Sequence, residues 1–403
     1  MFAPVKEQID IIKRNTVEII PEEELEKKLA QSIKENKPLR VKLGCDPSRP
    51  DLHIGHGVVL QKLRDFQDLG HIAVLIIGDF TAMIGDPSGK NKTRPALTIE
   101  ETKINGKTYF EQASKILLEK NLEIRFNSEW LGKMTFMDVI KLAGHYTVAQ
   151  ILERDDFDKR INDQTPISLH ELLYPLSQAM DSVAINSDVE LGGTDQKFNL
   201  LVGRAIQESY GQKPQCIITL ELLEGTDGVE KMSKSLDNAI CFTDTPKDIF
   251  GKTMSIPDKL IMKYYTLATP LTDTELKTID KELKDPATNP RNLKVKLGYE
   301  LVKKYYDEPA AQKALEEFET IFVKKGIPED IEKFRLPNKD LNIVKLMCIT
   351  GTAASSSEAS RLIKQGAVTI DGEKITDVKH PIKAIKDFIL KVGKRKFVKV
   401  IPE

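Results

Sequence analysis

Two histidines, His53 and His56, stand three residues apart at the start of a predicted helix, with Gly55 between them. At this spacing both side chains project from one side of the first turn, where free backbone N–H groups and the positive end of the helix dipole favour an anion. Two imidazoles there could stabilise negative charge that develops on a phosphate, which is electrostatic rather than acid–base catalysis. The spacing also allows a simpler interpretation, in which Asp51 caps the helix and both histidines are solvated.

A pair of lysines, Lys231 and Lys234, lies far along the chain in the polar segment DGVEKMSKSLDN (227–238). Gly228 gives this segment freedom to move, so two mobile ammonium groups could close on a polyphosphate and neutralise its charge as pyrophosphate leaves. An ordinary lysine-bearing surface loop is the alternative. The histidine and lysine motifs together, in this order, favour a site that handles phosphate.

Polar residues between these motifs indicate a pocket. Tyr174, Gln178 and Asp181 fall at i, i+4 and i+7 and share one face of a predicted helix that is otherwise rich in leucine. The stretch ELGGTDQ (190–196) places two glycines at a strand-to-helix turn, where backbone could approach a ligand closely. Glycine pairs also occur in ordinary loops, so this turn is weak evidence by itself.

An alternation of strands and helices must position these residues. The strand LRVKLG (39–44), a helix over 53–69 and the apolar run HIAVLIIGD (71–79) form a βαβ unit, and such a run is typical of a strand buried on both faces. The alternation continues, with a helix near 109–119, to the strand QCIITLE (215–221). The predicted fold is therefore α/β, a Rossmann-like doubly wound parallel sheet with ligands at the carboxyl ends of its strands.

Three domains are predicted: a catalytic α/β domain over 1–244, an α-helical domain over 245–335, and a small α+β domain over 341–403. The last carries twelve Lys and Arg against six Asp and Glu, in a chain whose formal net charge is −1. A basic module on a slightly acidic body indicates nucleic-acid binding, although a solvated surface could carry the same charges. In this domain Ser357 is predicted to cap a helix with Arg361 and Lys364 on one face.

Composition excludes several classes of protein. A chain of 403 residues with 40% apolar and 30% charged residues is typical of a globular protein, and the sequence has no run of eighteen apolar residues and no secretory leader. A cytoplasmic protein without membrane contact is predicted. The cysteines are scattered singly, which argues against zinc, other metal sites and disulfides: Cys45, Cys216, Cys241 and Cys348. GDPSGK (85–90) is not a Walker A loop, because only three residues separate its glycines.

HIGH (53–56) and KMSKS (231–235) are the signatures of the class I aminoacyl-tRNA synthetases, which this chain resembles. LIIGDFTAMIGDPSGK (75–90), the segment from 173 to 204 and an S4-like tail resemble the bacterial tyrosyl-tRNA synthetase family, over nearly the whole chain. The resemblance implies that tyrosine and ATP, with magnesium and without zinc, give tyrosyl-adenylate and pyrophosphate. The tyrosyl group then passes to the 3′ end of tRNA(Tyr). It also implies a homodimer.

The resemblance assigns roles residue by residue. It implies catalytic roles for His53, His56, Lys231, Lys234, Lys90 and Arg94, the last two in a basic loop that acts on pyrophosphate. It implies ATP contacts from Gly44, Asp46, Ser48, His53, Gly55, His56, Gly193, Asp195, Lys231, Met232, Ser233, Lys234 and Ser235. It implies tyrosine contacts from Lys42, Gly44, Asp46, Thr81, Asp86, Tyr174, Gln178, Asp181 and Gln196, with Asp181 accepting from the phenol. RNA contacts are implied for Arg361 and Lys364.

Two positions depart from the better-known branch of the family. Lys42 stands where that branch has a tyrosine that touches the substrate phenol, and Glu190 stands where it often has glutamine. These differences resemble the second bacterial branch and leave the geometry of phenol recognition open.

Three rival functions share some of these features. The tryptophanyl-tRNA synthetases are disfavoured by the polar helix face and the S4-like tail. Nucleotidyltransferases and pantothenate-synthetase-like ligases also carry H-x-G-H, but they are shorter and lack a basic RNA module. A non-catalytic RNA-binding protein derived from a synthetase is disfavoured because both signatures are intact.

Overall fold

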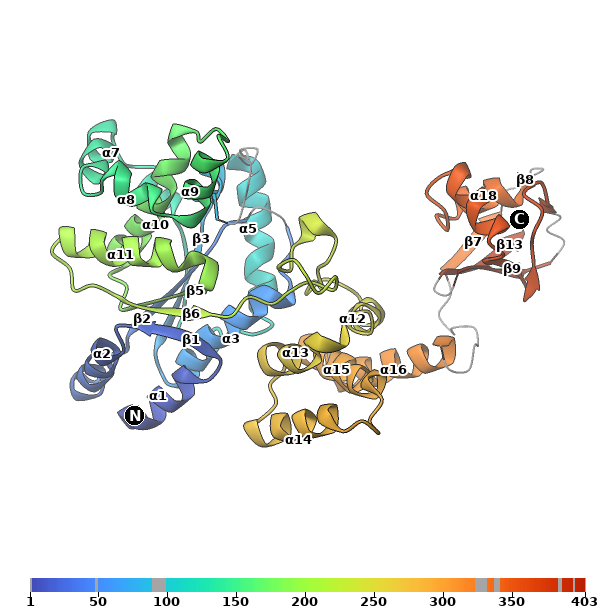
Figure 1. The fold of residues 1–403 in the computed structure, drawn as a ribbon, viewed down its shortest axis with the longest axis horizontal. Coiled ribbons are helices and arrows are strands. Elements are labelled where there is room, and N and C mark those ends of the chain that lie inside the picture. The colour runs from blue at the N-terminus through green and yellow to red at the C-terminus, as the bar shows by residue number, and fades with distance from the viewer. Residues whose placement is uncertain are drawn as a thin grey trace. The chain divides into compact units, whose positions relative to one another are not determined.

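The computed structural model describes residues 2–47, 50–88, 99–322, 332–336, 341–382, 386–393 and 396–402. The chain divides into two compact units, Met1–Tyr305 and Tyr306–Glu403 (Figure 1). Three predicted site residues lie outside the described ranges: Ser48, Lys90 and Arg94.

A six-stranded sheet in the order β1-β6-β5-β2-β3-β4 forms the centre of the first unit. Five of its strands are parallel: β2 (Arg40–Cys45), β3 (Ile72–Ile77), β4 (Leu122–Phe126), β5 (Val189–Gly193) and β6 (Cys216–Leu220). Every residue of β5 and β6 is buried, as expected for strands covered on both faces. The predicted doubly wound parallel sheet is confirmed, and β1 (Thr16–Ile20) adds an antiparallel edge strand beside β6 that was not predicted.

The strand order reverses between β2 and β5. From β2 the chain continues to β3 and β4 on one side of the sheet, and it later returns to β5 and β6 on the other side. β2 and β5 are direct neighbours, with Val41 opposite Val189. Ligands of open α/β sheets bind in the crevice at such a switch point. Gly44 and Gly193, both predicted to contact ATP, are at the carboxyl ends of these two strands.

Helices pack around this sheet (Figure 1). α3 (Ile54–Asp68) joins β2 to β3 and contacts both, while α10 (Leu169–Ile185) and α11 (Lys197–Ser209) pack on each other. α5 (Ile99–Ala113) ends earlier than the helix predicted near 109–119. The apolar pattern continues past its end, because Ile116 and Leu117 are buried in the irregular segment that follows. The other α-helices described before residue 246 are α1 (Val5–Lys13), α2 (Glu22–Glu35), α4 (Thr81–Ile84), α6 (Ser128–Leu131), α7 (Phe136–Ala143), α8 (Val148–Leu152) and α9 (Asp155–Asn162).

Four more helices complete the first unit: α12 (Pro246–Thr253), α13 (Ile261–Ala268), α14 (Asp273–Lys284) and α15 (Pro290–Tyr305). α12 packs along α15, whose Leu293, Leu297 and Leu301 are fully buried. The helical character predicted from residue 245 onward is confirmed up to this point. None of the helices in the described part of the chain is both long enough and apolar enough to cross a membrane.

The second unit contains α16 (Glu308–Phe322) and a five-stranded sheet in the order β10-β9-β12-β13-β7. Its strands are β7 (Glu332–Leu336), β9 (Val368–Ile370), β10 (Glu373–Lys374), β12 (Phe388–Val392) and β13 (Lys396–Pro402). A two-stranded sheet, β8 (Leu341–Asn342) with β11 (Pro381–Ile382), and helices α17 (Ile343–Ile349) and α18 (Ser356–Lys364) complete it.

Two expectations for the second unit need correction. β7 lies inside the segment predicted to be helical, because its partner is the remote strand β13, to which it runs parallel. The predicted boundary at residue 341 therefore falls within this unit. Ser355, and not Ser357, caps α18, since Ser355 has extended backbone and its Oγ accepts from the Glu358 N–H at 3.2 Å. Ser357 is already in the first turn of the helix.

Candidate active site

The two signature motifs meet at the start of α3. His53 is the N-cap of this helix. The Ile54 N–H donates to the carbonyl of Ile240 at 2.9 Å, and the Phe242 N–H donates to the carbonyl of Leu52 at 2.9 Å. The chain that follows the lysine loop (227–238) is therefore paired with the residues that lead into α3.

Asp51 does not cap α3. Its carboxylate instead accepts from the Lys234 ammonium and from the Thr243 hydroxyl. Both histidines are partly buried, and their ring centroids lie 3.8 Å apart. The interpretation in which Asp51 caps the helix and the histidines are solvated is wrong.

Both imidazoles are neutral at pH 7. Burial and the nearby Lys231 ammonium lower the pKa of His56 to about 4. Burial, His56 and Lys231 lower the pKa of His53 well below its usual range. The His56 Nδ1 accepts from the His53 backbone N–H at 3.2 Å, so the His56 proton is on Nε2, which remains a donor. The buried Nδ1 of His53 has no hydrogen-bond partner among the described residues.

The lysine loop is fixed by its own polar contacts. The Asn238 side chain accepts from the Ser233 N–H at 2.7 Å and donates to Asp227 Oδ2 at 2.6 Å. Met232 is buried, and its N–H donates to the carbonyl of Leu223 at 2.9 Å. The two lysines of this loop therefore project from an ordered turn.

Each loop lysine contacts a carboxylate from another part of the site. Lys231 Nζ lies 2.7 Å from Oδ2 of Asp195, which follows β5, and Lys234 contacts Asp51. These two ion pairs bring the loop to both the β5 end of the switch point and the start of α3.

Asp46, just beyond β2, forms the centre of a second group. It accepts from the Tyr174 hydroxyl at 2.9 Å and from the Thr81 hydroxyl at 2.7 Å. Burial and the Asp46 carboxylate raise the pKa of Tyr174 well above its usual range, so its phenol stays a donor. A Cβ at Gly78 would lie 2.0 Å from Asp46 Oδ1, which explains the need for glycine at this position.

Asp86 lies in a third group. Its carboxylate accepts from Gln196 Nε2 at 2.9 Å, from the Ser88 hydroxyl at 2.6 Å and from Arg154 Nη2 at 3.3 Å. Arg154 is only 4% exposed and also pairs with Asp156 at 2.7 Å. Sequence reasoning missed Arg154 because it lies in a stretch of alternating charges, which is typical of solvated helices.

Asp181 is buried on the face of α10 that also carries Tyr174. It accepts from Trp130 Nε1 at 2.9 Å and from Asn127 Nδ2 at 3.4 Å. Burial raises the pKa of Asp181 to about 7, partly offset by Lys42, Trp130 and Asn127. Asn127 also donates to the Thr81 hydroxyl at 2.9 Å, which links this group to that of Asp46. Asn127 directly follows β4, so the strand-end rule could have identified it.

Lys42 and Glu190, the two departures from the better-known branch, form a fully buried ion pair with Nζ 2.8 Å from Oε1. The Lys42 ammonium also donates to Ser182 Oγ at 2.8 Å and to the carbonyl of Gln178 at 3.1 Å. Gln178 Nε2 donates to Glu190 Oε1 at 3.2 Å. Three protein groups therefore already accept from the Lys42 ammonium. The expected contact of Lys42 with tyrosine stays a prediction.

The glycines expected to contact ATP differ in their surroundings. No atom lies within 4 Å of a Cβ built at Gly44, so the end of β2 borders open space. A Cβ at Gly55 would lie 3.0 Å from His53 Nδ1, and one at Gly193 would lie 2.7 Å from Asp195 Oδ1. A side chain at Gly55 would therefore crowd the His53 ring, and one at Gly193 would displace Asp195 or Leu222, which also lies 2.7 Å from the Cβ position.

The remaining predicted residues have simple surroundings. The Ser233 and Ser235 hydroxyls lie 2.9 Å apart in the lysine loop. Arg361 and Lys364 lie in the second unit, in the last turn of α18.

Across the described part of the chain, no three His, Cys, Asp or Glu side chains gather as a metal site would require.

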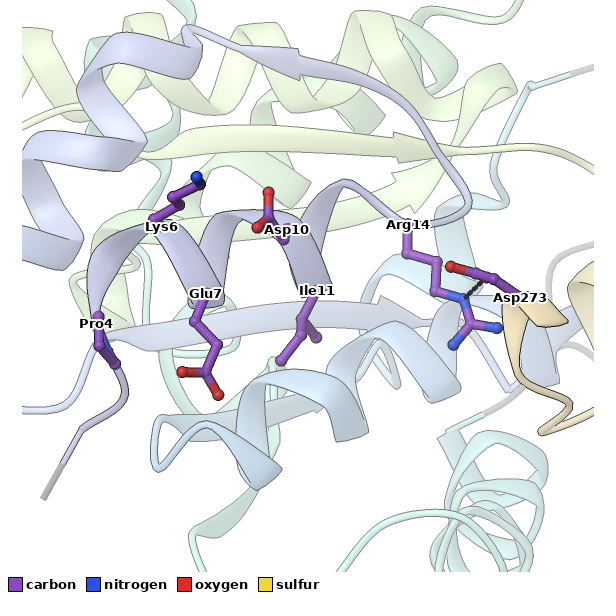
Figure 2. Close-up of a pocket in the computed structure, with 7 residues that line it drawn as sticks. All are labelled: Pro4, Lys6, Glu7, Asp10, Ile11, Arg14 and Asp273. Carbon is purple, nitrogen blue, oxygen red and sulfur yellow. Dashed lines mark ion pairs between the residues drawn. The ribbon is translucent and has the colours of Figure 1, made fainter.

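A shallow pocket of about 530 Å³ lies elsewhere, beside α1 (Figure 2). It is lined by Pro4, Lys6, Glu7, Asp10, Ile11, Arg14 and Asp273, and Arg14 Nε lies 3.0 Å from Asp273 Oδ1. None of the predicted site residues lines this pocket. Its charges are mixed and two of them are paired with each other, so we assign it no chemistry.

Two family models match the chain. Residues 34–323 match the class I tRNA synthetases of the tryptophan (W) and tyrosine (Y) group, and residues 322–400 match the C-terminal domain of SYY-like tyrosine–tRNA ligases. The tyrosine–tRNA ligase of Chlorobaculum tepidum is 56% identical over 99% of this chain and 98% of its own length. That of Thermotoga maritima is 55% identical over 98% of this chain and 97% of its own length.

Solved structures share the fold. Tyrosyl-tRNA synthetase from Aeropyrum pernix aligns with a TM-score of 0.63 at 22% identity, over 77% of this chain and 98% of its own. The Archaeoglobus fulgidus enzyme, solved in complex with L-tyrosine, aligns with a TM-score of 0.62 at 24% identity, over 77% of this chain and 100% of its own. At these identities the likeness establishes the architecture.

Proposed function

This chain belongs to the class I tRNA synthetases of the tryptophan and tyrosine group, and on that premise we propose that it ligates tyrosine to tRNA. The observation that carries the choice of tyrosine is Asp181, a buried carboxylate held by Trp130 and Asn127 at the polar face of α10. Each of its oxygens keeps acceptor capacity for a phenol. Sites that hydrogen-bond a hydroxyl reject an analogue without it by roughly 10⁴ to 10⁵, and tyrosine-selecting synthetases are the known example.

In the first step the tyrosine carboxylate attacks the α-phosphate of ATP. The bond from the α-phosphorus to pyrophosphate breaks, and its electron pair leaves with pyrophosphate. The neutral His56 donates from Nε2 toward the developing charge, with His53 beside it, and Lys231 and Lys234 neutralise the leaving group. Magnesium would enter with ATP as part of that substrate and would offset the charge of its phosphates.

The other predicted residues hold the two substrates. Asp195, in the turn after β5, takes the ribose hydroxyls once Lys231 moves to phosphate. Asp86 receives the substrate ammonium, with Thr81, Tyr174 and Gln178 nearby. Gln196 contacts the carboxyl end of tyrosine. What supports these roles is that Thr81, Asp86, Asp195 and Gln196 follow the carboxyl ends of β3 and β5, and that Tyr174 donates to Asp46, just beyond β2.

The second step moves the tyrosyl group to the 3′ end of tRNA(Tyr). The basic second unit binds the RNA, with Arg361 and Lys364 of α18 contacting phosphates. The enzyme works in the cytoplasm, where translation takes place.

We also propose that the chain acts as a homodimer. The support, besides the family resemblance, is a set of exposed apolar side chains near the N-terminal ends of α7, α8 and α10, including Phe136 at 80%, Val148 at 62% and Leu169 at 78% exposure. Such side chains in neighbouring helices are typical of an interface, and a two-fold axis pairs one such surface with its own copy. Sedimentation of the unmodified chain and of Phe136→Glu measures the oligomeric state. A monomeric unmodified chain would contradict the proposed homodimer.

Exchange of radiolabelled pyrophosphate into ATP tests the activity. We expect exchange with tyrosine and none with tryptophan, phenylalanine or pantoate, because only tyrosine offers a phenol donor to Asp181. Tryptophan-dependent exchange would favour the sister activity of the family. No exchange with tyrosine would reject the proposed function.

A further inference from the structure

Asp51 contacts Lys234, one of the two lysines that face the leaving pyrophosphate. Its Oδ2 contacts Lys234 Nζ, and its Oδ1 accepts from Thr243 Oγ1 at 2.8 Å. Asp51 lies two residues before the N-cap of α3, and Thr243 lies just beyond the lysine loop. This carboxylate therefore joins the two signature motifs through side chains, next to the backbone pairing of Leu52 with Phe242.

The geometry of the pair favours a positioning role over a chance surface contact. The side chains of Lys234 and Asp51 are 30% and 20% exposed, so water screens their attraction less than it does for a fully exposed pair. The Thr243 hydroxyl fixes the carboxylate from its other oxygen. An ammonium has three donors, so a contact with Asp51 leaves donors for a phosphate.

The pair also has an entropic consequence. A lysine side chain has four rotatable bonds, and ordering it when substrate arrives would reduce the free energy gained from its contact with phosphate. A lysine that is already anchored loses less freedom in the transition state. Lys231 is not anchored in the same way. Its partner Asp195 is assigned to the ribose hydroxyls, so the Lys231–Asp195 ion pair must break when ATP binds.

We propose that Asp51 is a positioning residue that holds the Lys234 ammonium beside the first turn of α3, where pyrophosphate forms. The inference rests on the proposed function, because it assigns Asp51 a part in adenylate formation. Asp51 itself does not touch the reacting atoms and acts through Lys234.

The test is a double-mutant cycle in the full chain, measured by tyrosine-dependent pyrophosphate exchange. Asp51→Asn keeps the size and the acceptor for Thr243 but removes the charge, and we expect kcat to fall about tenfold while KM for tyrosine stays unchanged. In a Lys234→Ala background the same substitution should change kcat by less than about twofold. Asp51→Glu should restore most of the loss.

Two further variants separate positioning from general effects. Thr243→Val leaves the charge but releases the carboxylate, so we expect a smaller loss than with Asp51→Asn. Glu230→Gln removes one negative charge from an exposed side chain of the same loop and should leave kcat unchanged.

An equal fall in kcat from Asp51→Asn in the presence and in the absence of Lys234 would overturn the inference. A kcat that Asp51→Asn leaves unchanged or raises would also overturn it. A higher KM for tyrosine would show a role in folding or substrate binding instead, and it would also overturn the inference. Absence of exchange by the unmodified chain would reject the proposed function itself.

Discussion

At the scale of single side chains, the ionisation of Asp181 links the amino-acid site to pH. Burial raises the pKa of this carboxyl to about 7, while the Lys42 ammonium lowers it and the Glu190 carboxylate raises it. Below pH 7 the group is largely protonated, and the charge-assisted hydrogen bond to a phenol is lost. Between the ordinary carboxyl range and pH 7 the folded state binds a proton that the unfolded state does not, so this residue's contribution to stability falls as pH rises.

We therefore expect kcat/KM for tyrosine to rise up to tenfold per pH unit below a midpoint near 7, the value to which burial raises the Asp181 pKa. Steady-state exchange between pH 5.5 and 8.5 measures this profile. Asp181→Asn should remove the rise, because an amide does not titrate there. The same rise in Asp181→Asn would contradict the assignment.

Sequence reasoning found the residues that carry charge in recognisable motifs and missed those whose role depends on distant contacts. His53, Lys231 and Lys234 stand in local signatures. The role of Trp130 depends on its contact with Asp181, and that of Arg154 on its contact with Asp86; both partners lie elsewhere in the chain. No local spacing could have identified those two partners.

At the scale of elements, α3 depends on a close approach that only glycine allows. A Cβ at Gly57 would lie 2.6 Å from Tyr305 Oη and 3.3 Å from Phe242 Cζ. The rings of Tyr305 and Phe242 are buried, with their centroids 4.6 Å apart, so neither can easily move aside. α3 is thereby packed directly against α15 and the segment after the lysine loop.

Gly57→Ala should lower the free energy of unfolding by about 1–3 kcal/mol, as expected for overpacking in a core. Gly251→Ala in α12 is the matched control, because no atom lies within 4 Å of its Cβ position and alanine is the better helix former. Urea denaturation followed by circular dichroism measures both. Equal stability of the two variants would show that α3 and α15 can separate without loss.

The periodic elements were predictable, and the non-local strands were not. The apolar run of β3 and the amphipathic pattern of α10 can each be recognised in a short window of the sequence. β1 was missed because its partner β6 lies near the far end of the α/β alternation, and β7 was missed because only β13 makes it a strand.

At the scale of the whole molecule, the two units should separate the two steps of the reaction. Removing residues 323–403 takes away the basic sheet and α18 but leaves the six-stranded sheet and its helices intact. We expect tyrosine-dependent exchange to be retained and aminoacylation of tRNA to fall at least about tenfold, because the phosphate contacts are lost. Equal loss of both activities would argue that the deleted part of the second unit is structural.

A cut at residue 341 is the informative comparison. It would leave β7 without its partner β13, with the apolar side chains of Phe334 and Leu336 uncovered. We expect that shorter deletion to give a less soluble product than the cut at 323, which light scattering can measure.

The pairing of β7 with β13 also sets an order for synthesis of the protein. The first strand of the second unit pairs with β13, so its sheet cannot close until β13 has been translated and has left the ribosome. The six-stranded sheet is complete once β6 has emerged, far earlier. During translation, each nascent chain should therefore fold its adenylate-forming unit first, before it can hold the RNA to which tyrosine is passed.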